Sequence, residues 1–333
     1  MVTVESLPPV ARRTSSKSSG LSRLRIREGI VPTLLALEIL VFASVSQGFL
    51  TQINIANVLL NSVDLSLIAA GLTLVVLLGG IDLSTGPALG VIAWCVGQLT
   101  LAGWNPLWVI FVAAVLGILI GTLNGILTSR LGVTAIIATL GTAAIWKTVL
   151  FALWGGNDLF APPVSEYVSA HRTFGVPTVA FFVVAAYIAL WYVSRYRAFG
   201  RHVYAIGNDA EGARLTGVNV TRTGVLAYAF VGLMVGLASV VYMARVGVVQ
   251  ASSGGELTLG AIAAVVVGGS SITGGRGSVL GTFWGVLFIA VLQNGVVLSG
   301  VPPLWNGVLV GAFILLAVAV DVMTRRFSHS RGT

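Results

Sequence analysis

Charged residues are scarce in this sequence, and their scarcity limits the fold classes that are possible. Only 9% of the 333 residues are charged, whereas 56% are hydrophobic and the mean hydropathy is +0.96. Soluble globular proteins carry roughly 25% charged residues, so a soluble globule is excluded. Because a helical membrane crossing needs about 20 apolar residues, the expected fold class is all-α, a polytopic membrane helical bundle.

Cysteine and histidine are equally scarce. The single cysteine, Cys95, excludes an intramolecular disulfide and a multi-cysteine metal site, and the three histidines lie far apart in the sequence. The chain contains no GxxxxGK[ST] phosphate loop, no HExxH and no GxSxG. The sequence therefore predicts no catalytic residue, no metal site and no cofactor bound by this chain, and it argues against a membrane enzyme.

Nine long apolar runs predict membrane crossings. They cover residues 30–49, 57–79, 87–103, 107–128, 134–154, 176–194, 223–243, 278–298 and 303–322. A shorter apolar run at 259–269 ends in a Gly-Gly pair and is typical of a half-length or broken helix. Counting it, the bundle has about ten transmembrane helices.

The positions of Lys and Arg predict the orientation. With the N-terminus in the cytoplasm, 16 of the 19 basic residues fall on the cytoplasmic side, as the positive-inside rule requires. We expect residues 1–29 to be a disordered basic tail, residues 30–322 a transmembrane domain, and residues 323–333 a second tail. Both termini would then lie in the cytoplasm, with the chain in the inner membrane. The net charge of +8 reports this topology, and no nucleic-acid partner is expected.

Two Gly-Gly pairs, each closing an apolar run, predict helix breaks at the cytoplasmic side. Glycine lets a backbone bend, and hydroxyl and carboxylate groups that follow can satisfy the freed N–H groups. For the acid after the first pair, Asp82, a helix-capping role is favoured over a functional one. The likeness of the two breaks indicates two pseudo-related halves. The candidate pathway residues at the breaks are Gly79, Gly80, Asp82, Ser84, Gly268, Gly269 and Ser270.

Other polar residues lie inside the predicted crossings. Asp64 either lines the pathway or pairs with another helix, and both alternatives stay open. Gln293 and Asn294 could bond a solute hydroxyl, although helix packing is favoured. Glu38 and Lys147 could each pair across helices.

The cytoplasmic segment 195–222 predicts a docking element. Asn208 or Asp209 can cap a short helix over residues 210–215, and Gly217 can end it. Such a helix between two membrane spans suits a soluble partner, but a solvated loop that only marks topology is the alternative.

Four motifs resemble the permease subunits of bacterial ABC sugar importers, in the ribose, xylose and autoinducer-2 branch. GGIDLSTG at 79–86 is similar to the family's GGIDLSVG and departs from it only at Thr85. AIAAVVVGGSSITGGRG at 261–277, TLGT at 139–142 and the loop at 200–218 also match. In that family the loop seats in a cleft of the ATPase subunit. The resemblance implies that the coupling residues are Ala205, Ile206, Gly207, Asn208, Asp209, Glu211, Ala213, Leu215 and Gly217.

The resemblance also implies a function. The chain would be the permease subunit of an ABC importer, moving a small neutral sugar-like solute by alternating access: a pentose, a hexose or deoxyhexose, a polyol or autoinducer-2. Its partners would be a second permease copy or a paralogue, ATPase subunits that bind ATP and Mg, and an extracytoplasmic solute-binding protein. The alternative is an ion-coupled secondary transporter or channel, which would place several carboxylates deep in the spans.

Overall fold

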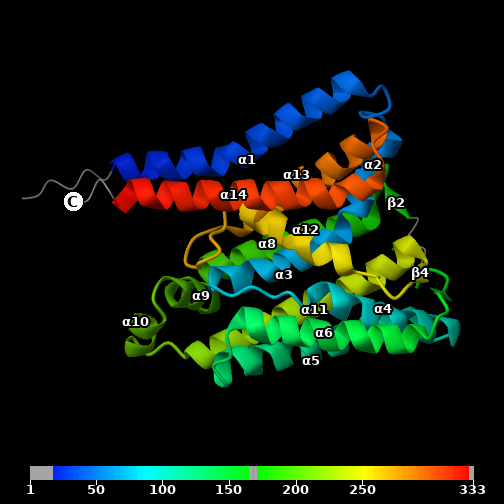
Figure 1. Cartoon of the computed structure of the whole chain (residues 1–333), viewed down its shortest axis with the longest axis horizontal. Helices are drawn as coiled ribbons and strands as arrows, with labels where there is room; N and C mark the ends of the chain where they lie inside the picture. The colour runs from blue at the N-terminus through cyan, green and yellow to red at the C-terminus, as the bar shows by residue number, and fades with distance from the viewer. Residues whose placement is uncertain (1–17, 165–167, 169–170, 330–333) are drawn as a thin grey trace, which may run out of the picture.

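The computed structural model describes residues 18–164, 168 and 171–329. Most of these residues form helices aligned along one long axis (Figure 1). The helices of the first part are α1 (Ser18–Val45), α2 (Gln52–Asn61), α3 (Val63–Leu77), α4 (Thr85–Leu101), α5 (Pro106–Gly125), the π-helix η1 (Ile126–Arg130) and α6 (Ala135–Trp154). Those of the second part are α8 (Thr178–Tyr196), α9 (Ala198–Asn208), α10 (Ala210–Leu215), α11 (Val220–Val246), α12 (Gly255–Val267), α13 (Val279–Leu298), the 3-10 helix η2 (Pro303–Trp305) and α14 (Asn306–His329).

Two very short antiparallel strand pairs lie at the end of the bundle opposite α10 (Figure 1). One joins β1 (Leu159–Phe160) to β4 (Val248–Val249), which connects the long segment after α6 to the turn after α11. The other is a hairpin of β2 (Arg172–Thr173) and β3 (Val176–Pro177).

The predicted helical membrane bundle is confirmed, but the count of crossings is not. Within the described residues, five helices are long and apolar enough to cross a membrane: α5 with η1, α6, α8, α11 and α13. The bent pair of α2 and α3 can supply a sixth, and four shorter apolar helices remain. Ten crossings therefore stay a prediction.

The crossing expected at 57–79 is not one continuous helix. Two helices, α2 and α3, meet there at a bend of 42°. The Thr51 side chain accepts from the Asn54 backbone N–H and starts α2 before the apolar run begins. The bend occurs at Ser62, whose hydroxyl donates to the carbonyl of Leu59 instead of capping α3.

The ends of the chain also differ from the expected tails. The first helix, α1, begins at Ser18, so residues 18–29 of the expected N-terminal tail are helical, and residues 1–17 lie outside the described residues. The last helix, α14, runs to His329. The start of α1 and the end of α14 lie at the same end of the bundle as α9 and α10 (Figure 1).

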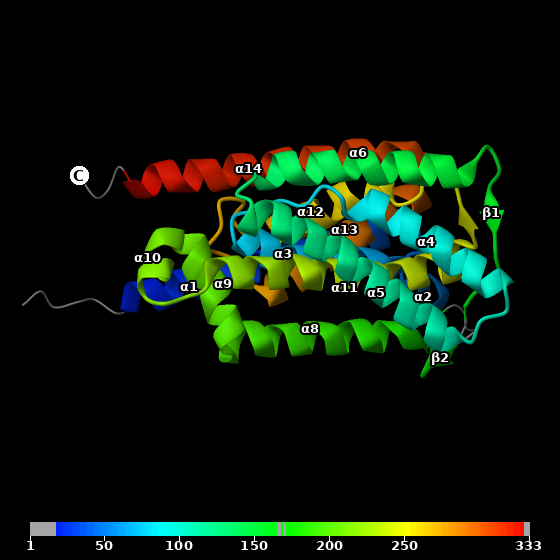
Figure 2. The same ribbon diagram turned by 90° about the horizontal axis from the view of Figure 1, so that it is seen from below.

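The centre of the bundle is α3. Every residue of this helix is buried, as expected of a helix that is apolar all round. Figure 2 places α3 and α11 in a layer between α6 on one side and α8 on the other.

Glycines let α5 and α11 pack closely. A side chain at Gly121 would meet the backbone carbonyl of Tyr228, and one at Gly117 would meet that of Gly232. Helices in membranes associate through such small residues, because the lipid offers no hydrophobic driving force between them.

Candidate functional site

Both predicted helix breaks are present and have the same geometry. After α3, Gly79 has φ +87°, and after α12, Gly269 has φ +87°. In each break the N–H of this glycine donates to the carbonyl three residues earlier at 2.9 Å. The next N–H, of Gly80 or Ser270, donates to the carbonyl five residues earlier at 2.9 or 3.2 Å. This left-handed helix end satisfies carbonyls that the last turn leaves unpaired.

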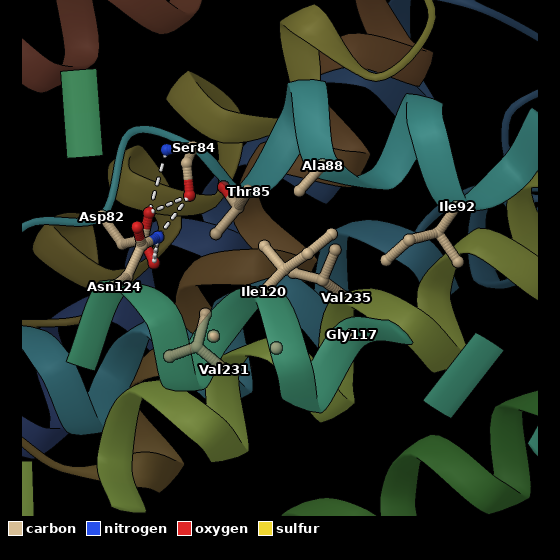
Figure 3. A pocket seen from close by; sticks show the side chains of 12 residues that line it. Asp82, Ser84, Thr85, Ala88, Ile92, Gly117, Ile120, Asn124, Val231 and Val235 are labelled. Atoms are coloured by element: carbon tan, nitrogen blue, oxygen red, sulfur yellow. Dashed lines mark hydrogen bonds between the residues drawn. The ribbon is translucent and has the colours of Figure 1, made fainter. Parts of the chain in front are cut away.

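A buried polar network follows the first break (Figure 3). The Asp82 carboxylate accepts from the backbone N–H of Ser84 at 2.9 Å and from its hydroxyl at 2.7 Å. The Asn124 amide on α5 donates to Ser84 Oγ at 2.7 Å, and Thr142 Oγ1 on α6 donates to Asn124 Oδ1 at 2.9 Å. Asp82 does not cap α4, since Ser84 is the residue before that helix and no side chain caps it; instead the network joins the loop between α3 and α4 to two other helices, which is a structural role.

Asn124 was missed at the level of sequence. Its amide lies beside Gly125 at the end of an apolar helix, and an amide in such a position requires partners because lipid supplies none. The polarity of Asn124 was the available signal. Its partners, Ser84 and Thr142, lie far away in the sequence, so the sequence did not show what it binds.

The start of α4 is held by α12. The Thr258 hydroxyl accepts from the Gly86 backbone N–H at 2.7 Å and lies 3.2 Å from the Thr85 hydroxyl. Position 85 is where the sequence departs from the signature it resembles. The Thr85 hydroxyl forms a hydrogen bond with Thr258 on α12, so the polar group that replaces the usual Val is satisfied between the two helices.

Asp64 pairs with Arg245. The two side chains form an ion pair between α3 and α11, and Arg245 Nη1 also donates to Asn61 Oδ1 at 3.3 Å. The Asp64 side chain is fully buried, whereas 23% of the Arg245 side chain is exposed. Of the two open alternatives for Asp64, the contacts favour pairing between helices.

The amide of Asn294 also serves helix packing. Asn294 on α13 and Asn54 on α2 exchange two hydrogen bonds, both of 2.9 Å, and Gln293 is half-buried beside them. Glu38 is buried in α1 and Lys147 is exposed on α6. Neither forms an ion pair among the residues that the structure describes.

The predicted short helix of the cytoplasmic segment is confirmed as α10. The Asp209 carboxylate accepts from the N–H groups of Glu211 and Gly212 at 3.1 and 3.0 Å, so Asp209 is the cap and Asn208 is not. Gly217, with φ +87°, ends the helix. The Leu215 side chain is 81% exposed, an unusual position for a leucine outside the apolar spans.

The preceding helix, α9, was not predicted. It buries Gly200, Val203 and Ile206, which are three residues apart and therefore share a face. This spacing was the available signal, although the charged residues around it favoured a loop.

A polar cluster stands at the opposite end of the bundle. The Asp158 carboxylate accepts from Gln250 Nε2 and Trp154 Nε1, both at 2.8 Å. These hydrogen bonds, that of Gln250 first, lower the pKa of Asp158 below its usual range. The cluster ties the segment after α6 to the turn after α11, beside the β1–β4 pair.

Neither described cavity suits a polyhydroxy solute. One, of about 10 Å³, lies between α4, α5 and α11 (Figure 3) and has room for a single water. The other, of about 310 Å³, is a crevice lined by Val91, Ile92, Cys95, Leu116, Leu119, Ile120, Leu123 and Trp146. A sugar needs hydrogen-bond partners, which the lining of the larger crevice supplies poorly, and the smaller cavity is too small to hold a sugar.

The helical bundle, its two matched breaks and the two short loop helices at one end define a polytopic membrane transport protein. The family described as "Branched-chain amino acid transport system / permease component" matches residues 54–318, and this chain belongs to that family. The chain is thus a permease subunit and not an enzyme, and ATP hydrolysis belongs to a separate subunit.

Several curated proteins are similar along most of their length. The ribose import permease protein RbsC of Bacillus subtilis is 34% identical over 286 residues, covering 85% of this chain and 89% of the relative. The fructose import permease protein FrcC of Rhizobium meliloti is 34% identical over 307 residues, covering 88% and 84%. The autoinducer 2 import system permease protein LsrC of Escherichia coli O9:H4 is 35% identical over 259 residues, covering 77% and 75%. No solved structure matches.

Proposed function

We propose that this chain is the permease subunit of an ATP-binding-cassette importer that carries a small neutral sugar-like solute into the cytoplasm. The observation that carries the proposal is the helix pair α9 and α10, the second of them capped by Asp209, which projects from one end of a membrane bundle of this family. The solute class rests on the relatives, which are named for ribose, fructose and autoinducer 2. A pentose, a hexose or deoxyhexose, a polyol and autoinducer-2 all remain within the proposal.

The proposed orientation places both termini, α9 and α10 in the cytoplasm. ATPase subunits carrying ATP and Mg would dock on the coupling segment, which we define as residues 205–217, and the solute-binding protein would dock at the opposite end, near Asp158. One described cavity has room for a single water and the other is lined by apolar side chains, which supports a pathway completed by a second copy or a paralogue.

An ion-coupled secondary transporter is less well supported. Such a mechanism needs carboxylates in the spans that can bind and release an ion. Of the two candidate carboxylates, Asp64 is already paired with Arg245, which leaves the buried Glu38 in α1 as one candidate where the alternative needs several.

Two exposed leucines provide a matched test. Leu215 is 81% exposed on the coupling segment, and Leu304 is 88% exposed at the opposite end, in η2. We expect Leu215→Asp to reduce co-purification of the cognate ATPase subunit, because it places a charge on the docking surface, and Leu304→Asp to leave it unchanged. Equal retention by both variants would contradict the docking assignment. Uptake that an uncoupler abolishes at constant ATP would favour the ion-coupled alternative.

A further inference from the structure

The inner side of the coupling segment touches the first helix break and the loop that follows the second break, directly through backbone. A Cβ at Gly207 would meet the carbonyl oxygen of Leu77, the last residue of α3, and would lie 2.6 Å from the Gly275 nitrogen. A Cβ at Gly274 would lie 2.8 Å from the Gly79 nitrogen and 3.0 Å from the Gly207 oxygen. Three chain segments therefore meet without an intervening side chain, an approach that only glycine permits. We name Gly79, Gly207, Gly274 and Gly275 the glycine junction.

Hydrogen bonds connect the same three segments. The Gly275 N–H donates to the Leu77 carbonyl at 2.9 Å, so the loop after α12 holds the end of α3. From α9, the Tyr204 hydroxyl donates to the Gly277 carbonyl at 3.0 Å. The Asn208 amide donates to the Tyr204 carbonyl at 2.8 Å and to the Gly275 carbonyl at 3.4 Å.

The junction leaves little room for independent movement. Gly79, Gly274 and Gly275 have φ values of +87°, +86° and +71°, so their turns depend on conformations that other residues rarely adopt. Closely packed backbones shift as a unit, because packed interfaces are not continuously deformable. A displacement of α9 would therefore be passed to the ends of α3 and α12 together.

We propose that Gly207 and Asn208 are positioning residues that link the coupling segment both to the end of α3 and to the loop that follows α12. This inference rests on the proposed function, since it assigns the route by which an ATPase that moves α9 also moves α3 and α12. The two broken helices pack against each other, so the junction would move them as a pair. Such a coordinated shift suits the rigid-body movement that alternating access requires.

The test compares the solute moved per ATP hydrolysed, in vesicles that contain the chain with its cognate ATPase and binding protein. Gly207→Ala adds one methyl group toward the bundle and none toward the docking surface. We expect it to keep the ATPase bound while solute moved per ATP falls roughly 2- to 30-fold. Asn208→Ala removes two hydrogen bonds without adding atoms, and we expect a smaller fall in the same direction. Gly48→Ala is the control, because a Cβ there meets nothing within 4 Å.

Each outcome of this comparison supports or overturns the positioning role of Gly207 and Asn208. An unchanged ratio in both variants would overturn the positioning role, as would loss of ATPase binding, which would assign these residues to docking. If Gly207→Ala does not fold, the ratio measured for Asn208→Ala stands on its own. A wild-type chain that retains no ATPase would refute the proposed function itself, a result distinct from altered coupling in a complex that assembles.

Discussion

The ion pair between Asp64 and Arg245 gives the sharpest prediction. Arg245→Met keeps most of the apolar stem but removes the charge, and so leaves the fully buried Asp64 carboxylate without its partner. Breaking a buried ion pair from one side costs about 3–5 kcal/mol. Because 23% of the Arg245 side chain is exposed and water already reaches it, we expect the lower end, about 3 kcal/mol of unfolding free energy.

The reverse substitution should be milder. Asp64→Asn leaves the charge on Arg245, which is partly exposed and can be hydrated, so we expect about 1–2 kcal/mol. The double variant Asp64→Leu with Arg245→Met leaves no buried charge, and replacement of a buried pair by apolar residues is often neutral. It should therefore be more stable than Arg245→Met alone.

The assay is reversible unfolding in mixed detergent micelles, and Asp64→Leu alone is the second single variant that closes the double-mutant cycle with Arg245→Met. Arg245 also lies over the Tyr242 ring, with 5.9 Å from Cζ to the centroid, and Tyr242→Leu reports how much that contact contributes. A double variant as unstable as Arg245→Met would refute the reasoning. So would equal losses for Arg245→Met and Asp64→Asn.

Three further predictions concern packing, pH and the polar network. Gly121→Ala should destabilise by about 1–3 kcal/mol, because its Cβ meets backbone of α11, whereas Gly141→Ala meets nothing within 4 Å and should change the unfolding free energy little. Since Asp158 has a lowered pKa in the folded chain, its stabilisation is present above its unfolded pKa of about 3.9 and is lost as the pH falls through the lower folded value. Melting temperatures should therefore fall more steeply below pH 4 in the wild type than in Gln250→Leu, and parallel curves would contradict this. Thr142→Val should cost about 1 kcal/mol, because the buried amide oxygen on α5 loses its donor, and unchanged detergent unfolding would count against the network.

Structural features that depend only on residues close together in the sequence were predictable. The apolar segments follow from the partition of side chains into lipid, and the two breaks follow from Gly-Gly pairs that end apolar runs. The helix α10 was found with its bounds, because Asp209 and Gly217 carry its start and end signals. These features need no knowledge of where the rest of the chain lies.

The bend at Ser62 and the helix α9 escaped prediction for a different reason. No Gly or Pro marks the bend, and the apolar face of α9 becomes visible only when the bundle surface that it covers is known. In both cases tertiary packing decides the conformation over a weak local preference.

Local chemistry along the chain was sufficient for the helical membrane fold, its apolar segments, its two helix breaks and the capped helix α10. The polar partnerships required the folded bundle: Asp64 meets Arg245 across 181 positions and Asn54 meets Asn294 across 240. The contact of Gly207 with the end of α3 and with the loop after α12 also arises only in the folded bundle. Side-chain polarity says that a buried group needs a partner, but the packing of distant helices determines which partner it finds.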